Sequence, residues 1–506
     1  MKILLTTLNS KYVHSNLALK YMYGVAVGSG LDIELQEFTI NNEHSYIFGE
    51  LVRGNYDVVC FSCYIWNIEY TKRVCSDLKK ACPKVKIVLG GPEVSYDAVD
   101  FMETNSWVDI IMRGEGEVPF FQLCKEIVLE EYDLSKVSSI TYRENGEIMN
   151  TMPMKAVSME KLPFPYEELP LEKDKVIYFE SSRGCPYRCS YCISSIDKRI
   201  RVLPLDKTLT QLGYFIRSKV KQVKFIDRTF NFDADRAYAI WEYLIENDNG
   251  VTNFHFEICG EILQDRHIQL ISKARKGLFQ FEIGIQSTNP LALKAVNRSE
   301  NTFKIFENVE KLLALKNSHI HVDLIAGLPY ENFESFGRSF NKVYGLHADD
   351  LQLGFLKLLK GTKIYEERDE HGYVFMDVAP YEVISNKYIS AEELVQLKMI
   401  EKVLDLYHNR GGFDRTLGYL DCAVAETSFD FYNKLAVFYY ENGFQHKSHK
   451  KENLYRILYA FAKSCEGESR DFLSLGDKAK DLLTEDLEAT MNPDAVKKFM
   501  KKGWEI

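Results

Sequence analysis

The sequence of 506 residues lacks the features of a membrane protein and of an exported, disulfide-linked protein. No uninterrupted apolar run approaches the ~20 residues that a membrane-spanning helix needs. The first residues, MKILLTTLNSKYVHS, contain no sustained apolar core followed by a small-residue cleavage site. The 11 cysteines are an odd number scattered through a long chain, which argues against a disulfide framework. We therefore expect a soluble, cytoplasmic protein with no membrane partner.

The sequence also has no excess of positive charge. Its 63 Lys and Arg residues are outnumbered by 73 Asp and Glu residues, so the formal net charge is −10. Such a chain has no general attraction to a phosphate backbone, and nucleic acid is not the expected partner. With 46% hydrophobic and 27% charged residues the chain is typical of a globular protein, and its length predicts several domains.

The first part of the chain alternates β and α patterns. Helix-like stretches such as Leu17–Val27 and Ile68–Ala81 separate short apolar runs that we predict to be strands, namely Lys2–Thr7, Asp32–Glu37, Val58–Ser62, Ile87–Leu89 and Asp109–Met112. This alternation predicts an α/β fold with a doubly wound parallel sheet, of the Rossmann or flavodoxin type, over residues 1–135. Its ligand crevice is expected beyond the carboxyl ends of the strands.

A linker is predicted over residues 136–174. It contains a possible hairpin, SSITYRENGEIMNT, with its turn at Asn145–Gly146, and a proline-rich stretch, LPFPYEELP. Proline fixes the backbone and removes hydrogen-bond donors, so the proline-rich stretch suits a connection better than a core.

A second alternating series follows over residues 175–373. Its predicted strands are Val176–Ser181, Val223–Asp227, Phe254–Cys259, Phe279–Ile285, Ile320–Ala326 and Leu351–Leu358, with helices such as Arg236–Glu246 and Thr302–Leu315 between them. Six β/α units predict a partial (β/α)6 TIM barrel rather than a complete eight-stranded one. In residues 374–506, segments such as AEELVQLKMIEKVLDLYHN have apolar residues at three- and four-residue spacing, which predicts a mainly helical domain.

Three cysteines stand close together in SSRGCPYRCSYC, directly after the first strand of the second series. Cys185, Cys189 and Cys192 are separated by three and then two residues. A short loop at a strand end can bring its thiolates together around an iron–sulfur cluster. Three ligands for four irons leave one iron open to another molecule. Buried thiols or a zinc site are the alternatives, but zinc usually has a fourth Cys or His nearby, and none follows soon after Cys192.

This spacing, with the aromatic Tyr191 before the last cysteine, resembles the radical S-adenosylmethionine (SAM) superfamily. The resemblance implies a [4Fe–4S] cluster whose open iron is chelated by the amino and carboxylate groups of SAM. Reductive cleavage of SAM then gives a 5′-deoxyadenosyl radical, which abstracts hydrogen from unactivated C–H bonds. The resemblance also implies an external electron donor of the flavodoxin or ferredoxin type.

Other segments in the same order resemble the SAM-binding segments of that superfamily, namely FIDRTFN, FEIGIQS, LKAVNRSENTF and DLIAGLP. The resemblance implies SAM contacts from Tyr191, Asp227, Glu257, Glu282, Gln286, Ser287, Arg298 and Asp323. Taken singly, Glu257 and Glu282 are equally compatible with a wet barrel interior, and Arg298 with a surface position. The departure is DRTF, which replaces the commoner paired acidic residues and puts the contact from Asp227 in doubt.

A doubly wound domain ahead of such a barrel resembles the cobalamin-binding subgroup of the superfamily. The residues that carry this resemblance are Ser62 at a strand end, the LGGPEVS loop, and the GEGE run at Gly114–Glu117. Paired glycines allow close approach of a bulky ligand, and a helix N-terminus favours its phosphate. Flavins and nucleotides are the alternative ligands. The resemblance implies cobalamin contacts from Ser62, Gly90, Gly91, Pro92, Glu93, Gly114 and Glu115.

One departure from other cobalamin proteins concerns His14. Their Asp-x-His-x-x-Gly pattern is absent here, because Tyr12 stands two residues before His14 and Leu17 three after it. We therefore do not assign His14 as a lower axial ligand. Cys60 and Cys63 form a Cys-x-x-Cys pair at a strand end, and we expect them to pack as small hydrophobic residues.

The expected function is that of a cobalamin-dependent radical SAM enzyme, with methylation of an unactivated carbon or phosphorus as the commonest chemistry of the proteins that it resembles. The substrate is expected to be a small molecule or a peptide, and the C-terminal region, which resembles a domain of unknown function found with such proteins, to help select it. Two alternatives are open. One is a radical SAM methylthiotransferase, which needs a second cluster. The other is a non-catalytic cobalamin and iron–sulfur sensor.

Overall fold

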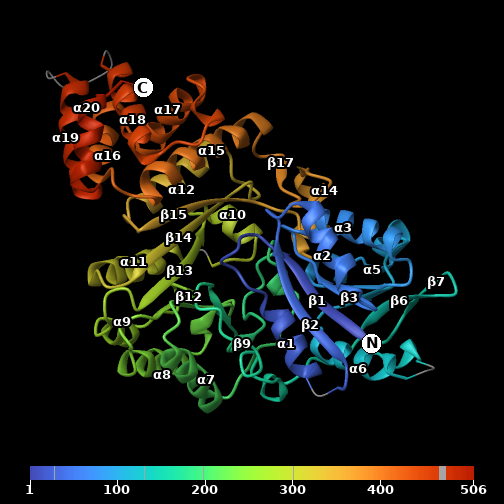
Figure 1. Ribbon diagram of the computed structural model, residues 1–506. Coiled ribbons are helices and arrows are strands. Elements are labelled where there is room, and N and C mark those ends of the chain that lie inside the picture. The colour runs from blue at the N-terminus through green and yellow to red at the C-terminus, as the bar shows by residue number, and fades with distance from the viewer. Residues whose placement is uncertain (28, 130–131, 198, 300, 467–473, 506) are drawn as a thin grey trace.

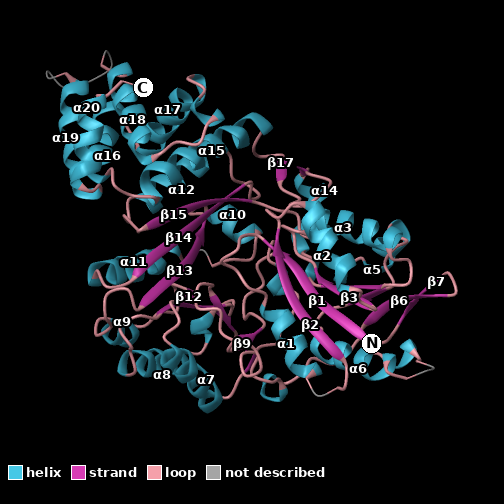
Figure 2. Cartoon of the chain, in the orientation of Figure 1, coloured by secondary structure: helices cyan, strands magenta, loops and turns pink. Residues whose placement is uncertain are grey.

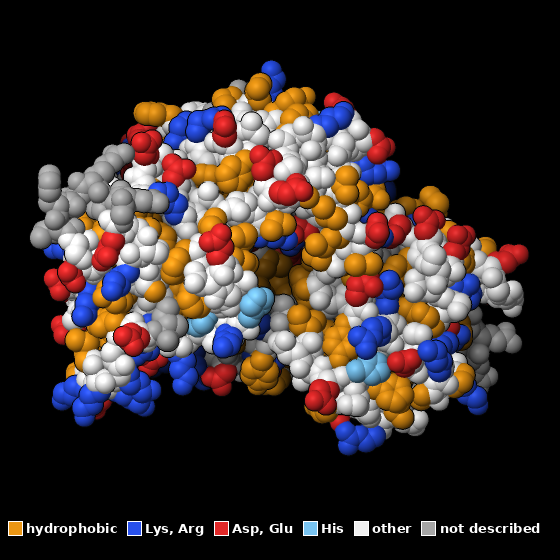
Figure 3. All heavy atoms as spheres, turned by 90° about the horizontal axis from the view of Figure 1, so that it is seen from above, with side chains coloured by type: hydrophobic (Ala, Val, Ile, Leu, Met, Phe, Trp, Pro, Cys, Tyr) orange, Lys and Arg blue, Asp and Glu red, His pale blue; other side chains and the backbone are white. Residues whose placement is uncertain are grey.

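The computed structural model describes residues 1–27, 29–129, 132–197, 199–299, 301–466 and 474–505 (Figure 1). The chain builds a doubly wound sheet, then an open barrel, then a bundle of helices. Figure 2 shows strands from the two sheets running toward the middle of the molecule, where loops lie between them. Figure 3, the view from above, shows a hollow near the centre of that face with hydrophobic side chains in its depth.

The N-terminal sheet has seven strands in the order β2-β1-β3-β4-β5-β6-β7. The strands are β1 (Lys2–Asn9), β2 (Asp32–Thr39), β3 (Val58–Ser62), β4 (Lys86–Gly90), β5 (Ile110–Met112), β6 (Ile140–Glu144) and β7 (Glu147–Asn150). The first five run parallel, which confirms the predicted doubly wound fold. Helices cover both faces, namely α1 (Leu17–Ala26), α2 (His44–Gly54), α3 (Ile68–Ala81), α4 (Pro92–Ser95), α5 (Ala98–Thr104) and α6 (Glu117–Ile127).

The two faces of this sheet pack in separate hydrophobic clusters. Leu4 of β1 lies in the cluster beneath α2 and α3, whereas its neighbours Ile3 and Leu5 lie in the cluster beneath α1 and α6. Successive residues of a strand point to opposite faces, so an uninterrupted apolar run is what a strand covered on both sides requires.

The hairpin that the sequence placed in the linker is part of the N-terminal sheet. Its strands β6 and β7 turn at Asn145–Gly146, where both residues have positive φ, as a tight two-residue hairpin turn requires. β6 pairs antiparallel with β5, with Tyr142 opposite Ile110. The hairpin therefore extends the sheet by two strands.

The second sheet has six parallel strands in the order β15-β14-β13-β12-β11-β8, the order of an open barrel. The strands are β8 (Ile177–Phe179), β11 (Gln222–Phe225), β12 (Asn253–Ile258), β13 (Phe279–Gln286), β14 (His319–Ala326) and β15 (Asp350–Phe355). The helices around them are α7 (Leu205–Ser218), α8 (Ala234–Glu246), α9 (Asp265–Ile271), α10 (Pro290–Ala295), α11 (Thr302–Leu315) and α12 (Phe333–Tyr344). The predicted partial barrel is thus confirmed.

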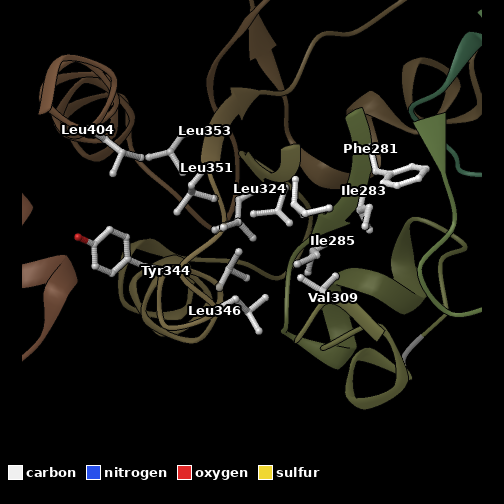
Figure 4. Packing of buried hydrophobic residues seen from close by; sticks show 14 of the residues in the cluster. Phe281, Ile283, Ile285, Val309, Leu324, Tyr344, Leu346, Leu351, Leu353 and Leu404 are labelled. Atoms are coloured by element: carbon white, nitrogen blue, oxygen red, sulfur yellow. The ribbon is translucent and has the colours of Figure 1, made fainter. Parts of the chain in front are cut away.

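Alternation along β13 separates the barrel interior from its helical coat. Phe281, Ile283 and Ile285 are buried outward, and Figure 4 shows Ile285 beside Val309 of α11. The residues between them face the interior and are polar or glycine, namely Gln280, Glu282, Gly284 and Gln286. The side chains of β13 are therefore polar toward the barrel interior and apolar toward the surrounding helices.

The C-terminal region is mainly helical, as predicted. It comprises α13 (Lys363–Glu366), α14 (Arg368–His371), α15 (Ala391–Leu404), α16 (Asp414–Val424), α17 (Ser428–Glu441), α18 (Lys451–Ser464), α19 (Leu475–Thr490) and α20 (Pro493–Lys502). A short two-stranded sheet precedes α15, formed by β16 (Val374–Phe375) and β17 (Val383–Ser385). The hydroxyl groups of Tyr344 on α12 and Tyr432 on α17 lie 3.1 Å apart, which joins barrel and bundle. Within the described residues, no helix is long and apolar enough to cross a membrane.

Candidate functional site

The loop after β8 carries the three clustered cysteines. It begins with a short strand, β9 (Ser182–Arg183), which pairs with β10 (Arg201–Val202). Gly184 follows with φ +91, and a Cβ there would lie 2.3 Å from the carbonyl oxygen of Arg199. Glycine is therefore required at the point where the chain turns into the cysteine segment.

Backbone hydrogen bonds hold the cysteine loop against the barrel. The N–H of Ser190 donates to the carbonyl of Val296 at 3.0 Å, and the carbonyl of Ser190 accepts from Ile364 at 3.0 Å. Cys189 is buried, and Cys185 Sγ lies 3.4 Å from Thr229 Oγ1. The loop is thus fixed against the barrel at Val296 and Thr229 and against the C-terminal region at Ile364.

The thiols lie close enough to influence one another. Burial raises the pKa of Cys189, the Arg298 guanidinium lowers it, and Cys192 and Cys185 raise it further. Among the described residues, no set of three or more His, Cys, Asp or Glu side chains is arranged around a single metal ion. In a cubane cluster each thiolate binds its own iron, so its ligands surround a larger object than one ion. The donor set fits a three-cysteine cluster better than zinc.

A cavity of about 220 Å³ lies beside Cys189, at the carboxyl ends of the barrel strands. Five of the residues predicted to contact SAM line it, namely Glu257, Glu282, Gln286, Arg298 and Asp323. The carboxyl ends of parallel strands meet at one edge of a sheet, which explains why residues far apart in sequence converge here. Sequence reasoning missed other lining residues, among them Tyr187, Arg228, Thr229, Cys259 and Glu261.

Four carboxylates line this cavity, and we call three of them, Glu257, Glu282 and Asp323, its acidic wall. Burial opposes ionisation of Glu282, but the hydrogen bond from His255 and the charge of Lys224 lower its pKa to about 2. The Glu282 Oε2 atom lies 3.1 Å from His255 Nε2 and 3.2 Å from Lys224 Nζ. Burial raises the pKa of Glu257 and of Asp323, and Asp323 pairs with His321 at 2.8 Å. The wall therefore holds at least one firmly ionised carboxylate.

Arg298 and Gln286 add further polar groups to this cavity. Arg298 Nη2 donates to the carbonyl of Gly284 at 2.6 Å, and its Nη1 approaches Cys189 Sγ at 3.7 Å and the Tyr191 hydroxyl at 3.4 Å. Gln286 has φ +72, and its buried Oε1 has no hydrogen-bond partner among the described residues. A buried acceptor without a partner is costly unless a ligand supplies a donor.

Three residues predicted to contact SAM do not line this cavity. Tyr191 lies behind Arg298 and accepts its hydrogen bond. Ser287 is fully buried and donates to Glu331 Oε1 at 2.6 Å. Asp227 accepts from the N–H of Ser181 at 2.8 Å and from the hydroxyls of Ser181 and Ser182 at 2.6 Å each. Its carboxylate thus fastens the start of the cysteine loop, and its contact with SAM stays a prediction.

A second cavity, of about 430 Å³, lies between the N-terminal sheet and the barrel. Tyr64 and Trp66, after β3, line it from one side, with rings stacked at 4.5 Å and an interplanar angle of 3°. Tyr178 and Ile226 line it from the barrel. Arg228 lines both this cavity and the one beside Cys189. The two cavities are therefore adjacent, and the Arg228 side chain lies between them.

Ser62, Gly90 and Gly91 lie at the carboxyl ends of β3 and β4, as predicted. Ser62 and Gly90 line a small apolar cavity of about 20 Å³ with Met112 and Phe120. Gly91 has φ +104, and a Cβ there would lie 2.4 Å from the carbonyl oxygen of Cys63. No side chain fits at Gly91, because its backbone packs directly against the backbone of Cys63 at this edge of the sheet.

The other residues predicted to contact cobalamin have protein partners or serve local structure. Pro92 begins α4, and Gly114 has φ +73. Buried Glu93 accepts from the Tyr381 hydroxyl at 2.9 Å. Glu115 accepts from Arg201 Nη1 at 3.0 Å, and Arg183 lies 3.6 Å away. The carboxylates of Glu93 and Glu115 thus join the N-terminal domain to later parts of the chain, and their contacts with cobalamin stay predictions.

His14 and the Cys-x-x-Cys pair have structural partners. His14 Nδ1 lies 2.8 Å from the Tyr178 hydroxyl of the barrel, and burial lowers its pKa. Cys60 and Cys63 are buried in the two hydrophobic clusters of the N-terminal sheet, where burial raises the pKa of both thiols.

Three family models match successive parts of the chain. Residues 3–123 match the B12 binding domain and residues 179–343 match the radical SAM superfamily. Residues 369–505 match a protein of unknown function, DUF4080. The chain is a radical SAM protein with a B12 binding domain. These domains imply the three expected cofactors, a [4Fe–4S] cluster, SAM and cobalamin.

Curated relatives of this radical SAM protein include the cobalamin-dependent radical SAM methyltransferase TokK of Streptomyces tokunonensis, which is 26% identical over 325 residues. That match covers 58% of this chain and 46% of TokK. The anaerobic magnesium-protoporphyrin IX monomethyl ester cyclase of a Synechocystis species is 25% identical over 252 residues, which cover 44% of this chain and 46% of the cyclase. The chain thus spans less than half the length of each.

Two solved structures share the fold of this radical SAM protein. The apo form of the cobalamin-dependent SAM radical enzyme OxsB aligns with a TM-score of 0.64 at 14% identity, over 99% of this chain and 79% of OxsB. The radical SAM methyltransferase TsrM from Kitasatospora setae aligns with a TM-score of 0.60 at 16% identity, over 75% of this chain and 76% of TsrM. At these identities the likeness concerns the fold.

Proposed function

We propose that this radical SAM protein is a cobalamin-dependent methyltransferase. The supporting observation is that Arg228 lines both the cavity beside Cys189 and the cavity against the B12 binding domain. When bound, the cluster and SAM together would supply the 5′-deoxyadenosyl radical, and cobalamin would supply the methyl group. A substrate held beside Arg228 would lie within reach of both cofactors, and the two domains would exclude water from it.

Cys185, Cys189 and Cys192 would hold the cluster. The acidic wall of Glu257, Glu282 and Asp323 favours the positively charged sulfonium and ammonium groups of SAM, as opposite charges attract in a partly buried site. In the same cavity, Arg298 would orient the SAM carboxylate and Gln286 Oε1 would accept a hydrogen bond from SAM. Tyr191 would hold Arg298 in place, as its hydroxyl accepts from Nη1.

The cobalamin ring would occupy the cavity between the domains, where Tyr64 and Trp66 provide a flat aromatic wall. Its nucleotide tail would enter beside Ser62 and Gly90, where a small apolar cavity already exists. Because His14 is held by Tyr178, we assign it to the domain interface rather than to the cobalt.

We propose a small molecule or a peptide as substrate, methylated at an unactivated carbon or phosphorus, and an electron donor of the flavodoxin or ferredoxin type. One relative, from Streptantibioticus cattleyicolor, is named as a 2-(S-pantetheinyl)-carbapenam-3-carboxylate methyltransferase. That name supports a small-molecule substrate class. A reducible cluster also suits the reducing cytoplasm.

The test is anaerobic incubation of the reconstituted chain with SAM, cobalamin and dithionite, followed by chromatography and absorption spectroscopy. We expect 5′-deoxyadenosine, and transfer of the SAM-derived methyl group to bound cobalamin. Cys189→Ala should abolish 5′-deoxyadenosine, whereas Cys422→Ala, at an exposed cysteine of the C-terminal region, should leave it unchanged. Binding of both cofactors without SAM cleavage would contradict the enzyme proposal and favour a sensor.

A methylthiotransferase is less well supported. The ribosomal protein uS12 methylthiotransferase RimO of a Nitratiruptor species is 24% identical over 238 residues. Four of the five N-terminal cysteines, however, are buried in the hydrophobic core, namely Cys60, Cys63, Cys75 and Cys124.

A further inference from the structure

A third cavity, of about 640 Å³, lies outside the barrel interior. The loops after β13 and β14, the helix α12 and the segment after β17 form its walls. Thr288 lines this cavity and Gln286 lines the one beside Cys189, while Ser287 between them is fully buried. The third cavity is thus a separate space on the other side of the β13 strand end.

The walls of this cavity carry concentrated positive charge in a chain whose net charge is −10. Arg338 and Lys342 stand one turn apart on α12, and Lys387 faces them from the C-terminal region. No Asp or Glu side chain within the described residues lines the cavity. Like charges one helical turn apart repel each other, so an anion bound between Arg338 and Lys342 would reduce this repulsion.

These cations are available to a ligand. Arg338 and Lys342 are exposed and make neither a hydrogen bond nor an ion pair with the part of the chain that the structure describes. The Lys387 ammonium group donates to the backbone carbonyl of Glu370 and forms no ion pair with the residues that the structure describes. Behind the wall, the buried carboxylate of Glu331 accepts from Ser339 Oγ at 3.2 Å. Burial raises the pKa of Glu331 to about 7, which diminishes its negative charge at neutral pH.

The rest of the wall is polar and aromatic. Asn332 and Ser335 line the cavity at the first turn of the twelve-residue helix α12, where the helix dipole favours an anion. Tyr330 and Tyr388 pack with ring centroids 4.7 Å apart. Tyr330 is 46% exposed and has φ +61, a backbone conformation that is costly for a side chain of this size. Asn289 Nδ2 holds it by donating to its carbonyl at 2.8 Å.

We propose that this cavity binds an organic phosphate, with the phosphate group between Arg338, Lys342 and Lys387 and the organic part against the Tyr330–Tyr388 pair. Guanidinium and ammonium groups form charge-assisted hydrogen bonds with phosphate oxygens, and an aromatic pair adds apolar contact that free phosphate cannot use. Lys387 and Tyr388 belong to the region matched by DUF4080, residues 369–505. The C-terminal domain therefore completes the site.

The test is calorimetric titration of the full-length chain with phenyl phosphate, inorganic phosphate and phenol at low salt. Phenyl phosphate is expected to bind saturably and more tightly than either of the others. Combined Arg338→Gln and Lys342→Gln should weaken its binding at least about tenfold, since two charge-assisted contacts are lost. Combined Lys497→Gln and Lys501→Gln is the matched control, because these exposed lysines also stand one turn apart, on α20, and should have no effect.

A second variant separates the aromatic contribution. Tyr330→Gly suits the positive φ at this position, so folding should be retained. It should weaken phenyl phosphate binding while leaving inorganic phosphate binding unchanged. Equal affinities of the wild type and the Arg338/Lys342 variant would overturn the proposal. An equal loss in the Lys497/Lys501 control would also overturn it, since binding would then reflect overall charge.

Discussion

At the scale of single residues, charged side chains in the barrel interior form specific pairs. Glu282 is held by His255 and Lys224, and its pKa is lowered to about 2, where burial alone would raise it. A carboxylate whose pKa is lower in the folded chain than in the unfolded chain stabilises the fold above its ordinary pKa. That contribution is lost as the pH falls toward the lower value.

Glu282→Gln tests this pairing. The variant should be less stable than the wild type at pH 7, by up to about 3 kcal/mol. The difference should shrink as the pH falls from the ordinary value of 4.5 toward about 2, where Glu282 in the folded protein becomes protonated. The measurement is the apparent midpoint of thermal unfolding against pH. Glu246→Gln, at an exposed position near the end of α8, is the control, and a pH-independent difference for Glu282→Gln would contradict the pairing.

Gly91 and Gly114, both in the N-terminal domain, allow a comparison of two glycines with different surroundings. Both have positive φ, but a Cβ at Gly91 would collide with the backbone of Cys63, whereas nothing lies within 4 Å of a Cβ at Gly114. Gly114→Ala should cost about 1 kcal/mol, from backbone conformation alone. Gly91→Ala should cost at least about 2 kcal/mol more and should lower cobalamin affinity. Equal midpoints of thermal unfolding for the two variants would contradict this account.

Strand alternation explains which residues of the barrel site were predictable. Gln286 points into the cavity, so Ser287, the next residue, points away and bonds to Glu331 instead. The sequence motif contains both residues and does not indicate which side chain faces a ligand. No sequence motif marks Tyr187 or Cys259 as a residue of this site. The Tyr187 hydroxyl donates to Cys259 Sγ at 3.2 Å, and this hydrogen bond joins two distant residues that meet only in the folded chain.

At the scale of elements, Asp227 at the end of β11 fastens the loop that follows β8. Its carboxylate accepts three hydrogen bonds from Ser181 and Ser182, directly ahead of the cysteine segment. The loop and the strand are thus tied together at the place where the cysteines must converge. Sequence comparison suggests instead that Asp227 contacts SAM, and the two roles have different consequences.

Asp227→Asn distinguishes these roles. An amide group would turn an N–H donor toward the donor groups of Ser181, and the stability should fall by about 2–4 kcal/mol. Iron content after reconstitution should fall with it. A direct SAM contact would instead leave the iron content unchanged and raise KM for SAM. Asp235→Asn, whose carboxylate is exposed and paired with Arg266, is the control.

Most elements followed from the sequence because their patterns are local. The continuously buried runs of β1 and β3 and the alternating run of β13 were predicted as strands, and the strands lie where these patterns placed them. The β6–β7 hairpin was recognised from Asn145–Gly146, but its membership of the N-terminal sheet was not. That membership depends on pairing with β5, which a local pattern does not encode.

At the scale of the whole molecule, ion pairs join the B12 binding domain to the barrel. Arg183 bonds Glu117 and Arg201 bonds Glu115, and the partners stand 66 and 86 residues apart in the chain. Charges at such separations have no pattern in the sequence, so the relative placement of the domains could not be predicted. This placement is what brings the two cofactor cavities together at Arg228.

The central claim is that three cysteines on the β8 loop hold a cluster with one open iron. The most direct measurement is iron and sulfide analysis with electron paramagnetic resonance of the reduced chain, with and without SAM, after anaerobic reconstitution. We predict about four irons per chain and a spectrum that changes when SAM is added, as an open iron requires. Loss of both in Cys189→Ala would agree with this account. A wild-type chain without iron, or a cluster spectrum that SAM leaves unchanged, would contradict it.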